Sequence, residues 1–355
     1  MFRKKNLVGF FAGLSMIVSA QVFAAQNFNI TGAGVRAKSM GGAFIGVADD
    51  ATSVVWNPGG LTVLERPEIS FVGQLVHDVY EGYNNPTHLI SNFNSLAIPT
   101  EIGLHSVVSA AYQRQIDFFD EFSYTDDDDV HTDVQITGGV DTITLGFGTR
   151  ITPALSVGVA PNLWLGEDER LENGEVDYND SYSGFNLTLG VMADLSALET
   201  PKPLKIGVVA RTPFELDVSD LTGEQEADYD HTFSMPWMVG VGASLLQGDN
   251  LTLALDYEMR NYGNTDDEQS NINEIRFGAE YIVITDMAVI PLRAGVKNVP
   301  NQDTESQGLG LSVGSGWIAE RFSLDAAYWY EHLGDLHGDG DVEQHTVGLS
   351  TIIYF

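Results

Sequence analysis

Charged side chains of both signs recur two or four positions apart in three neighbouring stretches of the C-terminal half. In chain order they are Asp256, Glu258, Arg260, Arg276, Glu280, Arg293 and Lys297. Arg276 and Arg293 are candidate counter-charges for a carboxylate ligand, because a guanidinium group offers a bidentate fork. The alternative is a ladder of opposite charges, which is how proteins commonly satisfy buried ionic groups.

Two stretches match catalytic patterns in part. The sequence GLSVG, Gly310–Gly314, has the spacing of a nucleophile elbow, but that serine must sit at a strand-to-helix turn and Ser312 lies in an alternating, strand-like stretch. The sequence GAGVRAKS, Gly32–Ser39, approaches a phosphate-binding loop but has Ala37 at a required glycine. The eight histidines show no metal-ligand spacing. The sequence therefore predicts a non-enzyme with no cofactor and no metal site.

Acidic runs offer a further ligand pattern. The oxygen-rich sequence DLHGDGDVE contains Asp335, Asp339, Asp341 and Glu343, but it falls short of a calcium-binding loop. This run and the acidic run at 126–129 are interpreted as solvated outer loops.

The elements that carry the charges have the periodicity of strands. In LTLALDYEMR, Leu251–Arg260, apolar and polar residues alternate, which is typical of a strand with one apolar and one polar face. The same pattern predicts about fourteen strands. They lie near 68–80, 92–99, 104–118, 132–150, 154–168, 181–195, 203–217, 232–246, 250–263, 272–284, 287–299, 308–318, 322–333 and 343–355.

The connections between these strands alternate between short turns and long acidic loops. An even number of strands with this alternation is typical of a single-chain outer-membrane barrel, with short turns toward the periplasm and long loops outward. A soluble β-sandwich is the rival architecture, but it would not place large apolar side chains on one face and Asp, Glu and Arg on the other in nearly every strand. The predicted fold is all-β, a transmembrane antiparallel barrel of about 14 strands over 68–355.

The first 24 residues have the composition of a secretory signal peptide. A basic start at Arg3–Lys5 precedes the apolar run Leu7–Ala20 and small residues before Ala25. Removal of this leader takes the formal net charge from −33 to −36, which argues against binding nucleic acid. The chain has no cysteine, so no disulfide or thiolate chemistry is available. We expect localisation in the outer membrane of a Gram-negative cell, in contact with outer-membrane lipid.

Residues 25–67 form the one sizeable segment without strand periodicity. A barrel of fourteen strands is wide enough to leak unless its lumen is occupied, so this segment is predicted to be an N-terminal plug. Asp49 or Asp50 is expected to cap a short helix through Trp56 or to pair with an arginine of the lumen. Pro58 is expected to end that helix, and residues 57–60 are expected to form a turn.

The stretch GAGVRAKSMGGAFIGVADDATSVVWNPGGL resembles the N-terminal hatch of the FadL-type long-chain fatty-acid and hydrocarbon transporters of outer membranes. Asn57 and Pro58 match the Asn-Pro-Ala motif of that hatch, and Gly59 replaces its alanine. The resemblance implies passive uptake of a hydrophobic molecule, gated by the hatch. The functional positions carried over are Asn57, Pro58, Gly59 and the acidic pair Asp49 and Asp50, either as hatch elements or as a structural turn.

Two other functions remain open on the sequence. PorV-like barrels, which assist a protein-secretion system, share the fold and a similar hatch, and a general porin is a third possibility that the plug disfavours. The C-terminal strand ending at Phe355 resembles the signal that the outer-membrane assembly machinery recognises.

Aromatic residues supply the candidate apolar contacts for a ligand. Phe28, Phe44 and Trp56 in the N-terminal segment, with Trp164 and Trp237 in the barrel, are expected to line an apolar pocket. The alternative is that they pack the protein interior or form the aromatic belts that barrels carry at the membrane surfaces.

Overall fold

The structure is a computed structural model that describes residues 32–80, 83–102, 104–125, 129–199, 201–221, 231–262, 271–300, 307–335 and 341–355. The expected signal peptide, Phe28, residues 126–128 and Asp339 lie outside the described residues.

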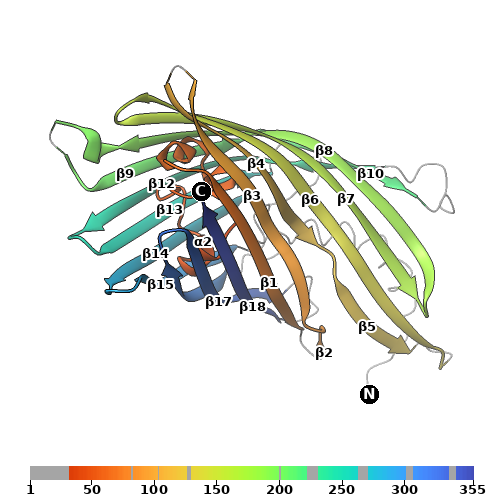
Figure 1. Cartoon of the computed structure of the whole chain (residues 1–355). Coiled ribbons are helices and arrows are strands. Elements are labelled where there is room, and N and C mark those ends of the chain that lie inside the picture. Colours follow the sequence, from red (N-terminus) through yellow and green to blue (C-terminus); the bar gives the residue numbers. More distant parts are fainter. Residues whose placement is uncertain are drawn as a thin grey trace.

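Fourteen antiparallel strands form a closed barrel, as predicted. Each strand pairs with the next along the chain, and the last strand pairs with the first from Glu68–Tyr354 to Tyr80–Val342 (Figure 1). The barrel strands are β1 (Glu68–Tyr80), β3 (His88–Ile102), β4 (Leu104–Asp117), β6 (His131–Thr152), β7 (Leu155–Glu172), β8 (Glu175–Asp194), β9 (Leu204–Arg211), β12 (Trp237–Gln247), β13 (Leu251–Asn261), β14 (Ile272–Ile284), β15 (Val289–Pro300), β16 (Gln307–Ile318), β17 (Phe322–Asp335) and β18 (Asp341–Tyr354).

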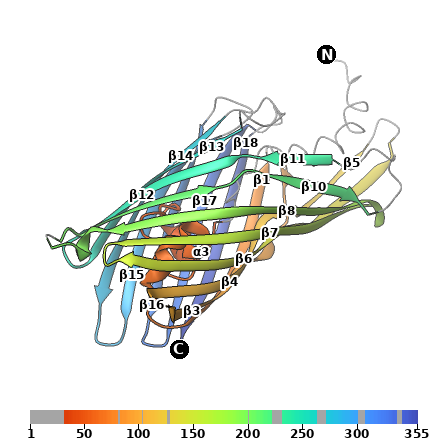
Figure 2. The same cartoon turned by 90° about the horizontal axis from the view of Figure 1, so that it is seen from above.

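Short strands extend the sheet at the outer end of the barrel. β10 (Phe214–Asp220) pairs with β8 and with β11 (His231–Met235), while β5 (Asp120–Thr125) pairs with β6 and β2 (Tyr83–Asn84) pairs with β1. Figure 2 shows β5, β10 and β11 at the same end. The opposite end carries the short turns and a short 3-10 helix, η2 (Leu195–Ala197).

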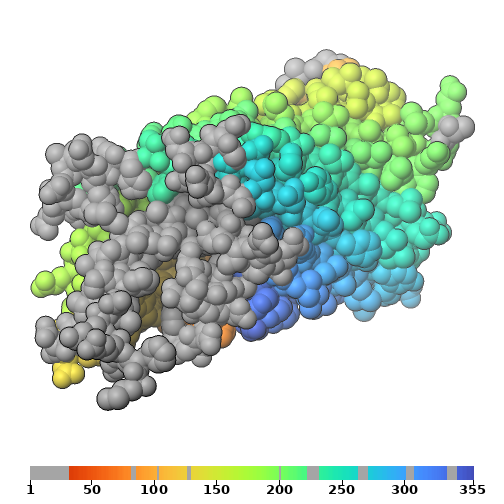
Figure 3. Space-filling view, turned by 180° about the vertical axis from the view of Figure 1, so that it is seen from behind, coloured from red at the N-terminus to blue at the C-terminus, as the bar shows by residue number. Residues whose placement is uncertain are grey.

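The two faces of the strands differ as the alternation predicts. On β13, Leu255 and Tyr257 face outward and are 54% and 44% exposed, whereas Asp256, Glu258 and Arg260 face the lumen and are 1% exposed. A membrane barrel has its apolar face toward lipid and its polar face inward, so the arrangement is inverted relative to a soluble protein. Figure 3 shows the outer surface of the neighbouring strands β12 to β16, coloured teal to blue.

The alternation changes phase where β6, β7 and β8 extend beyond the lipid-facing band. On β7 the outward side chains are apolar up to Leu165, and the next outward residue, Glu167, is exposed and charged. On β6, the outward residues Asp133 and Gln135 are exposed, and the inward residues that alternate with them, Val134 and Ile136, are buried. In water the outer face of a strand must be polar, and the apolar residues then turn inward.

One expected outer loop is instead a hairpin. Strands β7 and β8 continue to Glu172 and Glu175, and Asn173 and Gly174 connect them with φ angles of 51° and 82°. Two consecutive positive φ angles at an Asn-Gly pair are typical of a type I′ turn, which matches the twist of the strands. The acidic stretch at 167–180, which its composition predicts to be an outer loop, is therefore mostly strand.

The N-terminal segment lies inside the barrel, encircled by its strands (Figures 1 and 2). It contains the helices α2 (Val35–Ser39) and α3 (Ser53–Trp56) and the 3-10 helix η1 (Pro58–Val63). Within the part of the chain that the structure describes, no helix combines the length and apolar character needed to cross a bilayer.

Glycines in the wall allow the segment to approach the strands closely. A Cβ at Gly295 of β15 would lie 2.0 Å from the Gly41 nitrogen, and a Cβ at Gly190 of β8 would lie 2.2 Å from Asn57 Oδ1. Only glycine permits such a backbone approach, so the wall is shaped to receive this segment.

Candidate functional site in the barrel lumen

Asn57 connects the N-terminal segment to the barrel wall. Its side chain donates to the carbonyl oxygen of Ile45 at 3.1 Å and to that of Val191 in β8 at 3.0 Å, and its Oδ1 accepts from the Gly59 N–H at 3.1 Å. Asn57 is fully buried. Both polar atoms of the Asn57 side chain are therefore bonded, the nitrogen to the segment and the wall and the oxygen to the segment.

Pro58 and Gly59 follow as the first residues of η1. The helix α3 ends at Trp56, before the proline, as expected. The turn predicted at residues 57–60 is confirmed, since the Gly60 N–H donates to the Asn57 carbonyl at 2.8 Å, and the turn continues as the 3-10 helix η1. Asn57 caps this helix, and proline suits its first position because the missing N–H would have no helical partner there. Gly59 packs against the wall, 3.0 Å from the Met192 nitrogen when a Cβ is placed on it.

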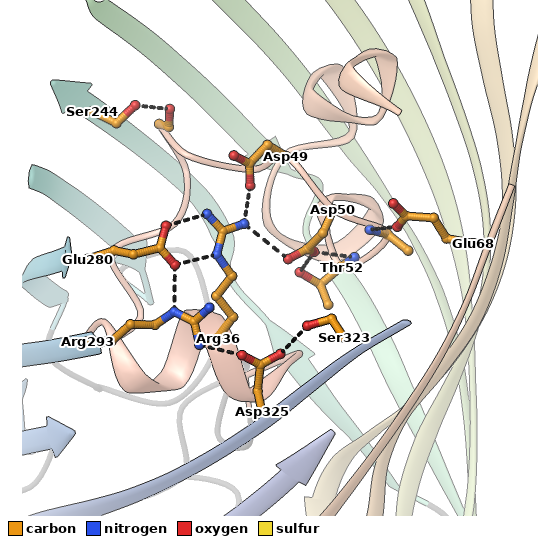
Figure 4. A network of polar contacts seen from close by, with 12 residues as sticks. Arg36, Asp49, Asp50, Thr52, Glu68, Ser244, Glu280, Arg293, Ser323 and Asp325 are labelled. Atoms are coloured by element: carbon orange, nitrogen blue, oxygen red, sulfur yellow. Dashed lines mark hydrogen bonds and ion pairs between the residues drawn. The ribbon is translucent and has the colours of Figure 1, made fainter. Parts of the chain in front are cut away.

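Arg36 is the centre of a polar network that joins the segment to the wall (Figure 4). It forms a bidentate pair with Glu280 of β14, with both nitrogen–oxygen distances at 2.9 Å. It also pairs with Asp49 and lies 3.7 Å from Asp50. The expectation that the acidic pair meets an arginine in the lumen is confirmed, although that arginine belongs to the segment itself.

Asp50 also shapes the start of α3. Its Oδ1 accepts from the backbone N–H of Thr52 at 2.9 Å, one residue before the helix. The residue that directly precedes α3 is Thr52, and its side chain makes no capping bond. Burial raises the pKa of Asp50 above 3.8, and Asp49 raises it further, against the lowering effect of Arg36 and the Thr52 hydrogen bonds.

The network continues through the wall. Arg293 of β15 donates to Glu280 at 2.6 Å and to Asp325 of β17 at 2.5 Å, and Ser323 donates to Asp325 at 3.2 Å (Figure 4). The guanidinium of Arg293 therefore lies between two buried carboxylates.

Arg276 has a similar environment. It donates to Glu274 at 2.9 Å and 3.0 Å and to Glu258 of β13 at 3.0 Å, while Arg260 pairs with the same two glutamates. The predicted proximity of these strands is confirmed by the register, which places Asp256 opposite Arg276 and Glu280 opposite Arg293. Both candidate arginines are paired within the protein, and contact of either with a ligand stays a prediction.

Lys38 carries a second connection to the wall. Its Nζ lies 3.6 Å from Glu331 of β17, which Lys297 of β15 approaches at 3.0 Å. Burial lowers the pKa of Lys38 to about 8, although the nearby Glu331 carboxylate opposes this shift.

Phe44 and Trp56 lie in the core of the segment. They are 0% and 3% exposed, and their rings meet edge to face with centroids 6.2 Å apart. The guanidinium of Arg36 lies 5.4 Å from the Phe44 ring, and that of Arg276 lies 5.7 Å from the Trp56 ring. Their expected contact with a ligand remains a prediction.

The backbone beside Phe44 is held by Asp256. One carboxylate oxygen of Asp256 accepts from the N–H groups of Phe44 at 2.6 Å and of Ile45 at 2.7 Å. A carboxylate that accepts two backbone donors is a strong anchor, because the hydrogen bonds are charge-assisted.

A second group of side chains, here named the apolar cluster, gathers on the inner wall toward the outer end. It joins the strands β4, β6, β7, β8, β10 and β11. Its buried members are Ile116, Phe118, Val134, Ile136, Val140, Trp164, Tyr182, Leu216, Val218 and Met235, and Phe122, Tyr124, Phe214 and Phe233 pack against them. Trp164 and Phe214 lie with ring centroids 4.9 Å apart, and Phe118 and Tyr182 lie 5.4 Å apart.

The sequence identified only Trp164 in this cluster. The signal for the rest is the change of phase in the alternation: in FELDVSD, Phe214, Leu216 and Val218 alternate with Glu215 and Asp217, which are exposed on the outer face. An apolar face opposite a charged outer face indicates a strand above the membrane with its apolar side in the lumen.

A band of polar side chains separates the apolar cluster from the N-terminal segment. Asn162 of β7 donates to Asn186 of β8 at 2.9 Å and to Thr188 at 3.0 Å, and it accepts from Thr144 of β6 at 2.7 Å. Trp164, at the edge of the cluster, donates its indole N–H to Asn186 at 3.0 Å. From Trp164 toward the start of β7, the inner wall is thus first apolar and then lined by amide side chains. At Gly158 it contacts Pro58 of the N-terminal segment.

Metal ligation has no support in the described ranges, where no group of three or more His, Cys, Asp or Glu side chains is placed to hold an ion. Asp335 and Asp341, from the acidic run considered for calcium, are register partners in β17 and β18.

No family model matches this sequence, and no curated protein matches it. Solved structures do match over nearly the whole chain. The Ralstonia pickettii toluene transporter TbuX is 15% identical with a TM-score of 0.66, and the match covers 93% of this chain and 100% of that one. The CymD monoaromatic hydrocarbon channel is 15% identical with a TM-score of 0.61, covering 93% and 99%. The Pseudomonas putida toluene transporter TodX is 11% identical with a TM-score of 0.63, covering 90% and 96%.

These matches define the class of fold. The chain has the architecture of an outer-membrane β-barrel, and within that class its fold is that of the FadL-type transporters. At this level of identity the likeness shows the fold alone. This fold is the one that the sequence resemblance at residues 32–61 implied.

Proposed function

We propose that this protein is a passive outer-membrane transporter for hydrophobic small molecules, with the N-terminal segment as its gate. The observation that carries the proposal is the apolar cluster on the inner wall, a position that a water-filled porin would give to polar side chains. Apolar solutes gain free energy in such surroundings and little in an aqueous channel. The solved toluene and monoaromatic hydrocarbon channels with this fold support the same function.

The gate is proposed from the way the segment is held. Its polar contacts to the wall include hydrogen bonds of Asn57 and ion pairs of Arg36 and Lys38, and water can replace these contacts. Its apolar side chains pack against wall residues such as Phe93, Val107 and Trp329, and displacement would have to open these contacts as well. A solute that passes the apolar cluster meets the amide band and then this segment, so displacement of part of the segment would complete the route.

The proposal includes no catalytic step. Ser312 lies within β16, where its hydroxyl donates to the Ser39 carbonyl at 3.0 Å and accepts from the Gly41 N–H at 2.9 Å. This supports a role in fixing the N-terminal segment.

Uptake of a neutral fluorescent hydrophobic probe, N-phenyl-1-naphthylamine, tests the proposed function. We expect faster, saturable entry into cells that produce the protein than into cells that produce the Trp164→Arg variant, which places a charge in the apolar cluster. Mass spectrometry of the purified barrel should then find a bound hydrophobic molecule. Equal entry in both strains, with a stoichiometric co-purifying protein, would instead favour an accessory barrel of a secretion system.

A further inference from the structure

The apolar cluster lies on strands that carry very few basic residues. Of the seventeen Lys and Arg residues in the sequence, three precede residue 6, and all the others lie in the described ranges. On the six strands that form the cluster, the basic residues are Arg114, Arg150 and Arg170. Arg150 lies at the far, short-turn end, where it donates to the Thr62 carbonyl at 2.7 Å.

The two basic residues near the cluster each meet two carboxylates. Arg114 lies 2.7 Å from Asp141 and 3.8 Å from Asp117. Arg170 lies 2.6 Å from Glu172 and 3.4 Å from Asp177. Each arginine is therefore outweighed by its own partners, and neither supplies net positive charge to the cluster.

Two further carboxylates face the lumen at the edge of the cluster. Asp168 of β7 and Asp180 of β8 stand directly opposite each other and are 3% and 0% exposed. The hydroxyl of Tyr182, a member of the cluster, donates to Asp168 at 3.1 Å. Two carboxylates that share a site can share one proton, and the pair then still carries a negative charge.

The charged groups that border the cluster without a cation of their own are thus the carboxylates Asp168 and Asp180, which accept hydrogen bonds. An ionised carboxylate has about four acceptor sites, so Asp168 can accept hydrogen bonds beyond those from Tyr182 and Tyr178. A ligand carboxylate placed there would meet like charge in surroundings of low dielectric constant, where repulsion is strong.

We propose that the apolar cluster selects hydrophobic molecules that are uncharged or end in a hydrogen-bond donor, and that Asp168 and Asp180 exclude fatty-acid anions. This inference rests on the proposed function and narrows its substrate class. It also assigns Arg276 and Arg293 to the ion-pair network of the barrel wall, since both guanidinium groups are occupied by buried carboxylates.

Binding of three matched ligands to the purified full-length barrel in lipid nanodiscs tests the proposal. 1-Dodecanol, dodecylamine and dodecanoate share one alkyl chain and differ in the charge and donor character of the head group. We expect dodecanoate to bind at least about tenfold more weakly than the other two at neutral pH. Dodecanoate binding as tightly as dodecanol would overturn the proposal while leaving hydrophobic transport intact.

Two variants that remove equal numbers of charges test whether Asp168 and Asp180 are the residues that exclude the dodecanoate anion. In the Asp168→Asn, Asp180→Asn double variant, the ratio of the dodecanoate and dodecanol dissociation constants should fall about tenfold. The Glu167→Gln, Asp217→Asn variant removes the same number of charges from the exposed outer faces of β7 and β10, and its ratio should match that of the wild type. An equal change in both variants would show a general surface-charge effect and contradict the assignment.

The unmodified protein provides an independent check. At about pH 4 a free carboxylic acid is largely protonated, so the C12 acid should bind about as tightly as dodecanol. Continued exclusion at that pH would mean that shape, not charge, rejects the acid, and the proposal would be wrong. If none of the three ligands binds and the probe in the uptake assay does not enter faster, the proposed function itself fails.

Discussion

The side-chain nitrogen of Asn57 lies 3.0 Å from the carbonyl oxygen of Val191, and this hydrogen bond crosses from the N-terminal segment to the barrel wall. The same amide group fixes Ile45 and Gly59 within the segment. One buried side chain therefore joins both halves of the segment to strand β8.

The Asn57→Ala variant should loosen the segment without unfolding the barrel. Each buried backbone group that loses its partner destabilises the docked segment by about 1–3 kcal/mol. We expect faster proteolysis of residues 32–64 and an unchanged heat-modifiable gel shift of the barrel. The Asn94→Ala variant removes an exposed hydrogen bond to Ser91 and serves as the control. Equal protease sensitivity of the two variants would contradict the role given to Asn57.

The Gly295→Ala variant tests the close approach of the segment to β15. The added Cβ would lie 2.0 Å from the Gly41 nitrogen, a backbone atom that cannot move by rotating a side chain. We expect displacement of the segment and a higher ion conductance of single barrels in planar bilayers. Gly73→Ala, where the nearest atom is 3.9 Å away, should conduct like the wild type. A wild-type conductance for Gly295→Ala would show that the segment does not seal the lumen.

The Arg276→Met variant leaves Glu258 and Glu274 buried without one of their partners. Breaking one side of a buried ion pair typically destabilises by about 3–5 kcal/mol, which urea unfolding in detergent can measure. Adding Glu274→Gln should recover part of the loss, because one uncompensated charge is then gone. Arg66→Met, which removes an exposed contact to Glu320 and a cation–π contact to Tyr354, should change stability by about 1 kcal/mol or less.

Docking of the segment should weaken as pH rises above about 4 because of Asp50. Burial raises the pKa of its carboxyl above 3.8, so the docked state holds the proton more tightly than an undocked, solvated segment. The stabilisation is complete below 3.8 and is lost as pH rises through the raised value. Asp50→Asn should flatten this pH dependence of protease protection, even though Arg36, Asp49 and Glu68 remain nearby. An unchanged slope in the variant would assign the effect to those other groups.

The strand pattern was well predicted because lipid forces each residue of a membrane strand to one face or the other. Leu255, Asp256 and Tyr257 alternate between lipid and lumen, and the edges of β1 and β14 agree with the predicted ranges. The apolar cluster was largely missed, because the phase of alternation reverses above the membrane and sequence alone does not mark the height at which lipid ends. The Asn173-Gly174 pair is a local signal for a tight hairpin turn, but the acidic composition around it led to the prediction of a long loop.

What the sequence by itself determined is the barrel, because period-two alternation and turn spacing are local properties of each strand. It also determined the chemical types present in the segment, including Asn57 and the acidic pair. Only the tertiary structure decided which of them meet. The partners of Arg36 come from residue 49 and from Glu280, 244 positions away. Closing the sheet between β1 and β18 encloses the segment and brings such distant charges within hydrogen-bonding distance.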